Sequence, residues 1–546
     1  MAPFTKLKFP LSFSLSRYIW ILLLPIAATA VYCFSRPFVL SVDSTYGFLA
    51  YKGTLFFRQF NVIPEIPVTD MGRVNPVFMS WWSPGQWIFP GILNAVLGIR
   101  LGVGAILVSL IALVTGFIGY YRVFLFFKFS VAISLLSILI IFSSSTLYYS
   151  FIVYQGGEVL EFAFYPWFLL YVMRIRRILV WNLLGTAALF LLCFIAKTTL
   201  LIYGALVVTA RIVHFYKFQN RIRLQLISNK LLLMLPILVL FVWIYIEYLS
   251  RGPRPALMNH FNISGEGILV PLTAPLCSIL SIQEWIGQVV KILTGILHLR
   301  ELSIFLLFIL YIFILWALVW AVKCLIRDKE VDKSYKNLFF ILFAGLIAFF
   351  LFAYSFNANI DFSSRHFKLM GYLFVPALVT ILYKRIGQSR IQIIVIIFCL
   401  ISMVDIIYLK EKWIKDRYIG VSYFYRNCEP PPAHDPLDRD SYLELLELDR
   451  IYSLRNKPII FFVESSADVA MDLHHPFILQ RPQEDIREKI YNKTGPDLMI
   501  CISKNTLEKE NPWVQSKFPG YRDFKKIAET NNYSFLLSSV DQVVKD

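Results

Sequence analysis

The sequence predicts a mainly α-helical, polytopic membrane protein with about eleven transmembrane helices and a small C-terminal α/β domain outside the membrane. Three observations predict it. The chain of 546 residues is 57% hydrophobic and only 16% charged, whereas globular domains are about 45–50% apolar and about 25% charged. Apolar runs long enough to cross a hydrocarbon core of about 30 Å recur as far as residue 410. From about Glu411 the composition becomes that of a soluble domain.

This composition argues against a soluble enzyme, a nucleic-acid binder or a disordered scaffold. The 48 Phe, 29 Tyr and 12 Trp suit a bilayer solvent, in which aromatic side chains fill cores and mark the interface. The net charge of +17 comes from 53 Lys and Arg against 36 Asp and Glu. Membrane proteins collect such positive charge in their cytoplasmic loops, so we expect a lipid bilayer and no nucleic acid as partner.

The first predicted span runs from about residue 18 to residue 40. It follows a basic start and lacks a small-residue cleavage site, so we expect a retained helix and not a removed signal peptide. The further apolar runs lie near residues 101–121, 131–147, 160–173, 179–196, 200–214, 231–249, 302–322, 337–356, 369–383 and 391–409.

The distribution of basic residues sets the expected orientation. With the N-terminus in the cytoplasm, alternation places every basic cluster inside, as the positive-inside rule requires. These clusters are at residues 6–17, 122–128, 174–177, 211–230, 323–336 and 384–390. The long connections 41–100 and 250–301 then lie outside, as does the chain after residue 410. We expect a multi-pass protein of a bacterial inner membrane, since no endoplasmic-reticulum retention signal is present.

Two domains are predicted. Residues 1–410 form the transmembrane domain, and residues 411–546 form an extracytoplasmic α/β domain. A proline-rich joint, CEPPPAHDP, spans residues 428–436, and strand-like runs follow at 457–464 and 497–503.

The first outer connection contains the acid on which the functional hypothesis depends most. Asp43 comes directly after the first apolar run and is followed by Tyr46. A helix N-cap explains Asp43 as an alternative, because Asp is a preferred capping residue. Asp70 lies further along the same connection, where a solvated loop would explain it equally well.

The second acidic candidate is Glu158, which follows two glycines in the YQGGE segment, with Glu161 one turn later. Two glycines allow a sharp turn or the close approach of a ligand. The alternative is an acid placed at a helix N-terminus, where the helix dipole favours it.

Cations occur at the predicted outer ends of other spans. Lys197 interrupts an apolar stretch, and Arg365, His366 and Lys368 follow Asp361 at the start of a later span. Ionisable groups at a membrane core are costly, and Lys or Arg in such places can bind phosphate. The alternatives are a snorkelling lysine and an Arg–Asp pair that only holds the loop in place.

These features occur in one order along the chain: an acid after the first span, the WWSPGQ stretch, the YQGGE acid, AKTT between two short spans, and SSRHFKLMGYLFVP. The order resembles that of the integral-membrane glycosyltransferases of the GT-C superfamily. This superfamily includes protein O-mannosyltransferases, aminoarabinose transferases of lipid A and catalytic subunits of oligosaccharyltransferase. The resemblance covers roughly residues 15–410.

The resemblance implies inverting transfer of a sugar from a polyprenyl-phosphate-linked donor to a glycan, lipid or protein acceptor on the non-cytoplasmic face. By analogy, Asp43 and Glu158 are the catalytic acids, with one of them as general base. Lys197 and Arg365 bind the donor phosphate. The remaining candidates for substrate binding are His366, Tyr46 and Asp70. The chain departs from the family in one respect: many members have two adjacent acids in the first loop, whereas here Ser44 follows Asp43.

Other functions remain alternatives. A polytopic transporter or flippase is one, although no paired interrupted helices occur in two corresponding halves. An O-antigen ligase or polymerase is another, although those enzymes carry their large outer loop in mid-chain. We expect no required cofactor; a divalent metal bridging the acids is the alternative.

Overall fold

The computed structural model describes most of the chain after residue 38. The described residues are 27, 31, 39–80, 83–177, 179–217, 231–251, 265–280, 300–356, 360, 363–416, 437–455, 458–464, 473–480, 490–491, 495–509, 513–521 and 523–538. The predicted first span therefore lies largely outside the described residues. So do Asp361 and the joint at 428–436.

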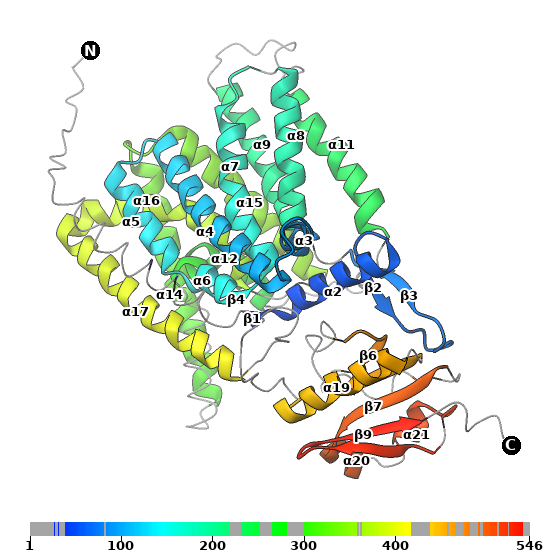
Figure 1. Cartoon of the computed structure of the whole chain (residues 1–546). Coiled ribbons are helices and arrows are strands. Elements are labelled where there is room, and N and C mark those ends of the chain that lie inside the picture. The colour runs from blue at the N-terminus through cyan, green and yellow to red at the C-terminus, as the bar shows by residue number, and fades with distance from the viewer. Residues whose placement is uncertain are drawn as a thin grey trace, which may run out of the picture.

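The described chain forms a large helical body and a small sheet domain beside it (Figure 1). The helices of the body are α2 (Val42–Phe57), α3 (Gly85–Leu97), α4 (Leu101–Phe126), α5 (Val131–Phe142), α6 (Ser145–Ile152), α7 (Gly156–Arg174), α8 (Val180–Ala196), α9 (Leu200–Lys217), η1 (Leu232–Met234), α11 (Leu235–Ile244), the π-helical η2 (Tyr245–Leu249), α12 (Gly265–Leu280), α14 (Arg300–Arg327), α15 (Lys333–Ser355), η4 (Ser364–Phe367), α16 (Lys368–Ile386) and α17 (Gln388–Asp416).

The chain is a multi-pass membrane protein. Every apolar run predicted beyond residue 100 forms a helix. Among the described residues six helices are long and apolar enough to cross a membrane, and α5 with α6, bent by 54°, makes a seventh if the pair is one span. This number is lower than the expected count of about eleven. One reason for the difference is that the predicted first span lies largely outside the described residues. The others are that α8 and the apolar part of α9 are shorter, and that α7 contains two glutamates near its start.

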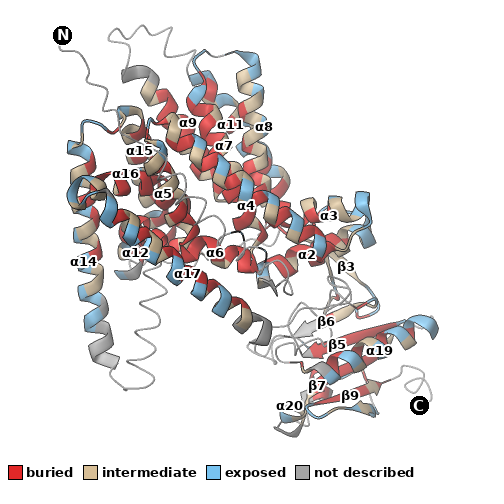
Figure 2. Ribbon diagram, turned by 60° about the vertical axis from the view of Figure 1, so that its left-hand side comes forward, coloured by how far each residue is buried: buried red, intermediate tan, exposed pale blue. Residues whose placement is uncertain are grey.

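Burial supports a bilayer as the solvent of this body. The buried residues lie along the inward faces of the helices, while the outward faces are exposed (Figure 2). On α14 the exposed side chains include Phe313 and Trp316, which are 61% and 63% exposed, and on α17 Val404 is 70% exposed. Large apolar side chains on the outside of several long helices are expected where lipid covers them.

Close helix packing in the body depends on small residues. A Cβ atom on Gly116 of α4 would lie 2.3 Å from the Phe162 ring of α7. Because Gly116 has no side chain, the backbone of α4 can pack directly against the Phe162 ring of α7. Small residues allow the same close approach between other membrane helices.

Two short strand pairs connect distant parts of the body. Strand β1 (Val39–Leu40) pairs in parallel with β4 (Val153–Tyr154), and β2 (Val62–Glu65) pairs antiparallel with β3 (Asn75–Phe78). The β1–β4 pair sets the starts of α2 and α7 side by side, because each strand immediately precedes its helix.

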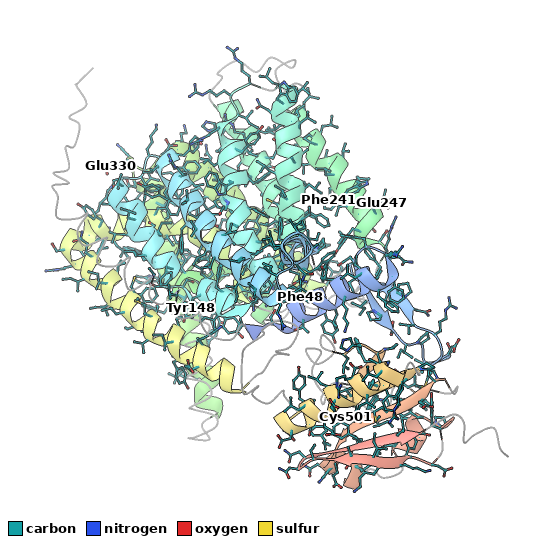
Figure 3. All side chains as sticks on the ribbon, viewed as in Figure 1. Phe48, Tyr148, Phe241, Glu247, Glu330 and Cys501 are labelled. Atoms are coloured by element: carbon teal, nitrogen blue, oxygen red, sulfur yellow. The ribbon has the colours of Figure 1, made fainter. Side chains whose placement is uncertain are left out.

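The terminal domain is the predicted α/β unit. Its strands, β5 (Ile459–Glu464), β6 (Phe477–Gln480), β7 (Asp497–Ser503), β8 (Lys525–Glu529) and β9 (Tyr533–Ser538), form one sheet in the order β6-β5-β7-β9-β8. Strands β5, β6 and β7 are parallel, and β9 runs antiparallel to β7 and β8. The predicted strand-like runs at 457–464 and 497–503 correspond to β5 and β7. Figure 3 shows Cys501 of β7 within this domain.

Both faces of the terminal sheet are covered. Helix α19 (Arg439–Arg455) packs on one face, with the short helices α20 (Lys504–Lys509) and α21 (Trp513–Lys517) elsewhere in the domain. The other face receives Ile66 and Met71 from the loop after α2 into its core. Lys52 of α2 also donates a hydrogen bond to the Leu473 carbonyl. The first long connection therefore packs against the terminal domain. Helix α17 continues to Asp416, six residues past the predicted boundary at 410.

Candidate functional site

Two glutamates and two lysines form a buried ion cluster where three helix ends meet. Glu158 and Glu161 lie in the first two turns of α7, three residues apart, so both project from one face of the helix. Lys197 is the C-cap residue of α8, and Lys368 is the first residue of α16. The four residues are called the ion cluster below.

Each lysine of the ion cluster contacts both glutamates. The ammonium groups of Lys197 and Lys368 bond to different oxygens of Glu158. Lys368 Nζ lies 2.9 Å from Glu161 Oε1, and Lys197 Nζ lies 3.4 Å from Glu161 Oε2. The cluster is therefore charge-balanced, with every carboxylate oxygen facing an ammonium group.

The ion cluster is buried to different depths. The side chains of Glu158, Glu161 and Lys368 are 8%, 3% and 1% exposed, and that of Lys197 is 16% exposed. Buried charges persist only when they are paired, and removal of one partner of a buried pair costs about 3–5 kcal/mol. Buried ionisable side chains within a membrane protein are typical of a functional site, because burying them costs free energy.

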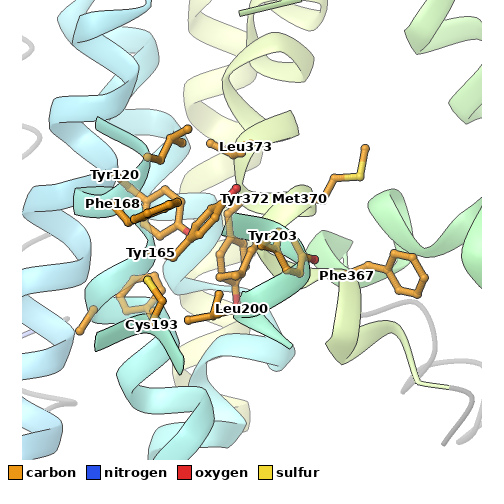
Figure 4. Close-up of a cluster of buried hydrophobic side chains, with 14 of the residues drawn as sticks. Tyr120, Tyr165, Phe168, Cys193, Leu200, Tyr203, Phe367, Met370, Tyr372 and Leu373 are labelled. Atoms are coloured by element: carbon orange, nitrogen blue, oxygen red, sulfur yellow. The ribbon is translucent and has the colours of Figure 1, made fainter. Parts of the chain in front are cut away.

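Four buried tyrosines lie in the core of the helical body, and two of them, Tyr120 and Tyr203, are near Glu161. Tyr120, Tyr165, Tyr203 and Tyr372 come from α4, α7, α9 and α16 and are fully buried (Figure 4). The Tyr203 hydroxyl donates a hydrogen bond of 2.8 Å to the His366 carbonyl, which ties α9 to the turn that carries the late cations.

The start of α2 is joined to the start of α7 by polar contacts. The Gly156 N–H donates to Ser44 Oγ at 3.0 Å, and the Tyr154 hydroxyl donates to the Gln86 carbonyl at 2.8 Å. A Cβ atom on Gly156 would lie 2.4 Å from Gln86 Cβ. The first glycine of YQGGE, Gly156, is thus required for the close approach of α7 to Gln86, the last residue of the WWSPGQ segment.

Asp43 is near this junction but outside the ion cluster. Its side chain is exposed, and among the described residues it has neither a hydrogen bond nor an ion pair. The alternative of Asp43 as an N-cap is not what forms, because Ser41 is the N-cap of α2 and accepts a hydrogen bond from the Ser44 N–H. Asp43 lies in the first helical turn, where an acid is favoured by the helix dipole. Tyr46, one turn on, is half-buried.

The late cations are placed by the short helix η4. Arg365 and His366 are half-buried, and the positive charge of Arg365 acts on Glu158. The His366 ring stacks on Phe350 of α15, with ring centroids 5.6 Å apart. Arg365 therefore lies in the surroundings of the ion cluster, and His366 is next to it in the chain.

Asp70 lies elsewhere. It is exposed in the loop between β2 and β3, where its Oδ1 accepts a hydrogen bond of 3.1 Å from the Gly72 N–H. Its neighbour Met71 is part of the core of the terminal domain. The structure gives Asp70 the role of a loop residue and does not bring it to the ion cluster.

Glu161 and Lys368 belong to the ion cluster, although the sequence by itself assigned neither of them a role. The signal for Glu161 was its spacing of three residues from Glu158, which places both on one helix face. Lys368 contacts Glu158 across a separation of 210 residues, and such a contact is not visible in a single sequence.

An open groove of about 740 Å³ lies between α3, α8, α11 and the β2–β3 pair. Its walls are mostly apolar and include Phe194 and Ile195 of α8, Ile88 of α3 and Trp243 of α11. Ile195 is two residues before Lys197. Glu247 of η2 lines the groove too, and Figure 3 shows it near Phe241 of α11. The described residues contain no group of three or more His, Cys, Asp or Glu side chains that could hold a metal ion.

No family model and no curated protein matches the chain. The structure is similar to a crystal structure of ArnT from Cupriavidus metallidurans bound to undecaprenyl phosphate. The likeness covers 95% of this chain and 98% of that chain, with 12% sequence identity and a TM-score of 0.42.

Proposed function

We propose that this protein is a membrane glycosyltransferase that moves a sugar from a polyprenyl-phosphate-linked donor to an acceptor on the non-cytoplasmic face of the membrane. The observation that carries the proposal is the buried ion cluster of Glu158, Glu161, Lys197 and Lys368 with Arg365 beside it. Two carboxylates and three cations leave one positive charge, which suits a phosphodiester with one negative charge.

Lys197 and Arg365 are the residues we assign to the donor phosphate. Lys197 is the more exposed lysine of the ion cluster, and Arg365 is half-buried at its edge. Hydrogen bonds from cations to phosphate are roughly twice as strong as neutral ones, and a guanidinium can bind two oxygens at once. Both groups thus stabilise the phosphate as it leaves with its negative charge.

The apolar groove accounts for the lipid part of the donor. Its walls include Ile88, Phe194 and Ile195, and Ile195 precedes Lys197 by two residues in the chain. We assign the lipid chain of a donor held at Lys197 to this apolar surface. Burial of such a chain is favourable at about 25 cal/mol for each Å² removed from water.

Asp43 is the general base of the proposed reaction. The acceptor hydroxyl oxygen forms a bond to the anomeric carbon on the face opposite the phosphate. The bond from that carbon to the phosphate oxygen breaks, the phosphate keeps the electron pair, and the hydroxyl proton passes to the Asp43 carboxylate. Asp43 is exposed and free to accept a proton. Both oxygens of Glu158 face ammonium groups, so Glu158 positions Lys197 and is the poorer base.

Binding of undecaprenyl phosphate to the purified protein tests the assignment. Lys197→Met and Arg365→Leu should each weaken binding by about 10- to 100-fold, since a hydrogen bond to a charged group is worth about 1.5–3 kcal/mol. Arg365→Lys should restore binding only partly, because the two-oxygen contact is lost. The matched control is Lys128→Met. Lys128 is an exposed lysine in the turn after α4, and it pairs with Asp332 at the start of α15.

A transfer assay in membranes completes the test. The parent should release free polyprenyl phosphate from a labelled donor, and the Lys197 and Arg365 variants should not. Equal affinity in all four variants and the parent would contradict the phosphate assignment. Binding without release would instead indicate a carrier or flippase.

A further inference from the structure

The two lysines of the ion cluster differ in how tightly they are held. Lys368 is 1% exposed, bonds to Glu158 and lies 2.9 Å from Glu161. Lys197 is 16% exposed and lies 3.4 Å from Glu161, beyond normal hydrogen-bond length. Lys197 can therefore leave one of its partners at smaller cost than Lys368.

The surroundings of Lys368 hold it in place. Its neighbours Leu369 and Met370 are 1% and 0% exposed, and a Cβ atom on Gly371 would lie 2.3 Å from Ser278 Oγ of α12. Lys368 is also the first residue of α16, where the helix dipole disfavours a cation. The two carboxylates are then the groups that stabilise its charge.

Movement of Lys197 away from the ion cluster changes the charge around the two glutamates. When Lys197 turns to a phosphate, Glu158 and Glu161 lose one of their two ammonium partners. An unpaired buried carboxylate is too costly to stay ionised and would take up a proton. Lys368 contacts both carboxylates, so each of them keeps an ammonium partner while Lys197 is away.

We propose that Lys368 is a positioning residue: a fixed counter-ion that holds Glu158 and Glu161 ionised while Lys197 exchanges between these carboxylates and the donor phosphate. The inference rests on the proposed function, because it assumes that Lys197 meets a phosphate. Glu158 then serves as the site to which Lys197 returns after the phosphate departs.

Thermal unfolding of the full-length protein tests the fixed position. Lys368→Met should lower the midpoint more than Lys197→Met, because it removes the ammonium group that is the more deeply buried of the two. Adding Glu161→Gln removes one negative charge, so the double variant Lys368→Met/Glu161→Gln should recover most of the loss. Equal losses for the two lysines, or no recovery in the double variant, would overturn the inference.

Phosphate binding by the double variant tests the positioning role. The probe is a farnesyl methyl phosphodiester, which keeps one negative charge throughout the pH range used. In the parent its affinity should stay level from weakly acidic to weakly basic pH. In the double variant, Lys197 is the lysine that remains at Glu158. When Lys197 moves to the phosphate, the Glu158 carboxylate has no lysine partner and takes up a proton. Affinity should therefore rise as the pH falls, by up to about tenfold for each pH unit.

Other titratable groups near the ion cluster are common to both proteins. Tyr120, Tyr203, Cys193 and Arg365 are near the ion cluster, and His366, which is next to Arg365 in the chain, stacks its ring on Phe350. Their titration would shift the parent and the double variant alike, so the comparison isolates Lys368 and Glu161.

The outcomes separate the two proposals. A parent that does not bind the phosphodiester contradicts the proposed function and the exchange of Lys197 with it. A parent that binds, together with a double variant of parental affinity and a level pH profile, contradicts the role of Lys368 alone.

Discussion

At the scale of single residues, the surroundings of an acid decide its chemistry. Glu158 and Asp43 both lie in the first turn of a helix, yet Glu158 faces two ammonium groups and Asp43 is exposed. A carboxylate held by two cations keeps its charge and orients them, whereas an exposed carboxylate is available to accept a proton. This is why we assign the base to Asp43.

Asp43→Asn should lower sugar transfer by at least about 10²-fold, the usual loss when a general base is removed. The midpoint of thermal unfolding should not change, because the side chain is exposed. Ser41→Ala is the matched control: it removes the N-cap of α2 and should cost about 1 kcal/mol of stability while transfer is largely kept. Near-parental turnover by Asp43→Asn would exclude Asp43 as the base.

Asp449 in the terminal domain provides a prediction about pH. Burial by itself would raise the pKa of Asp449, but hydrogen bonds from the rings and backbone N–H groups of His475 and His474 outweigh it and lower the pKa to about 2. The carboxylate is almost fully buried. Since the folded pKa lies below the unfolded one, this stabilisation is present above about pH 4 and is lost as the pH falls towards 2.

Asp449→Asn should therefore destabilise the terminal domain by about 2 kcal/mol at neutral pH and by much less near pH 2. The measurement is hydrogen exchange at increasing urea, read on the peptides that cover β5 and β7. A difference between parent and variant that does not depend on pH would contradict an ionised Asp449 in the folded domain.

At the scale of elements, the site depends on where helices begin and end. The β1–β4 pair and the bond from Gly156 N–H to Ser44 Oγ align the starts of α2 and α7. The C-cap of α8 and the first residue of α16 supply the two lysines. Helix ends leave backbone groups available and allow charged side chains to reach a shared space, which helix middles in a membrane do not.

Gly156→Ala tests the junction between α2, α3 and α7. Its Cβ atom would lie 2.4 Å from Gln86 Cβ and 2.8 Å from Gln86 Cα, so the WWSPGQ segment must move. Forcing atoms into a packed region costs about 1–3 kcal/mol. We expect lower thermal stability together with weaker undecaprenyl phosphate binding, because α7 carries Glu158.

Gly265→Ala is the matched control for this prediction. Gly265 is likewise the first residue of its helix, α12, and a Cβ atom there has nothing within 4 Å. Its replacement should be neutral or slightly stabilising, since Ala loses less backbone entropy than Gly on folding. Equal effects of the two substitutions would argue against a steric requirement at Gly156.

At the scale of the whole molecule, charged turns that are distant in sequence meet at one end of the helical body. The turn after α4, the turn before α15 and the end of α16 meet through ion pairs of Lys128 with Asp332, at 3.2 Å, and of Lys384 with Asp328, at 2.6 Å. The turn between α7 and α8 lies at the far end of the body from the terminal sheet (Figure 1). The ion cluster and the terminal domain are on the side of the α7 start.

A reporter fused after residue 546 should be active on the non-cytoplasmic side, because the positive-inside rule places the basic turns in the cytoplasm. A reporter inserted between α14 and α15, near Asp328, should be active in the cytoplasm and serves as the control. Cytoplasmic activity of the C-terminal fusion would reverse the orientation and place the proposed site on the wrong face.

Composition and local pattern by themselves determined the class of protein, the positions of the helices after residue 100, the strands β5 and β7, and the candidates Glu158, Lys197 and Arg365. Hydropathy and spacing are local properties, so one sequence suffices for them. Only the tertiary structure decided that Lys368 meets Glu158 across 210 residues, that the loop containing Asp70 packs on the terminal domain through Met71, and that Asp43 stays exposed. Which buried charges neutralise one another depends on how helices distant in sequence pack, and local pattern carries no information about that packing.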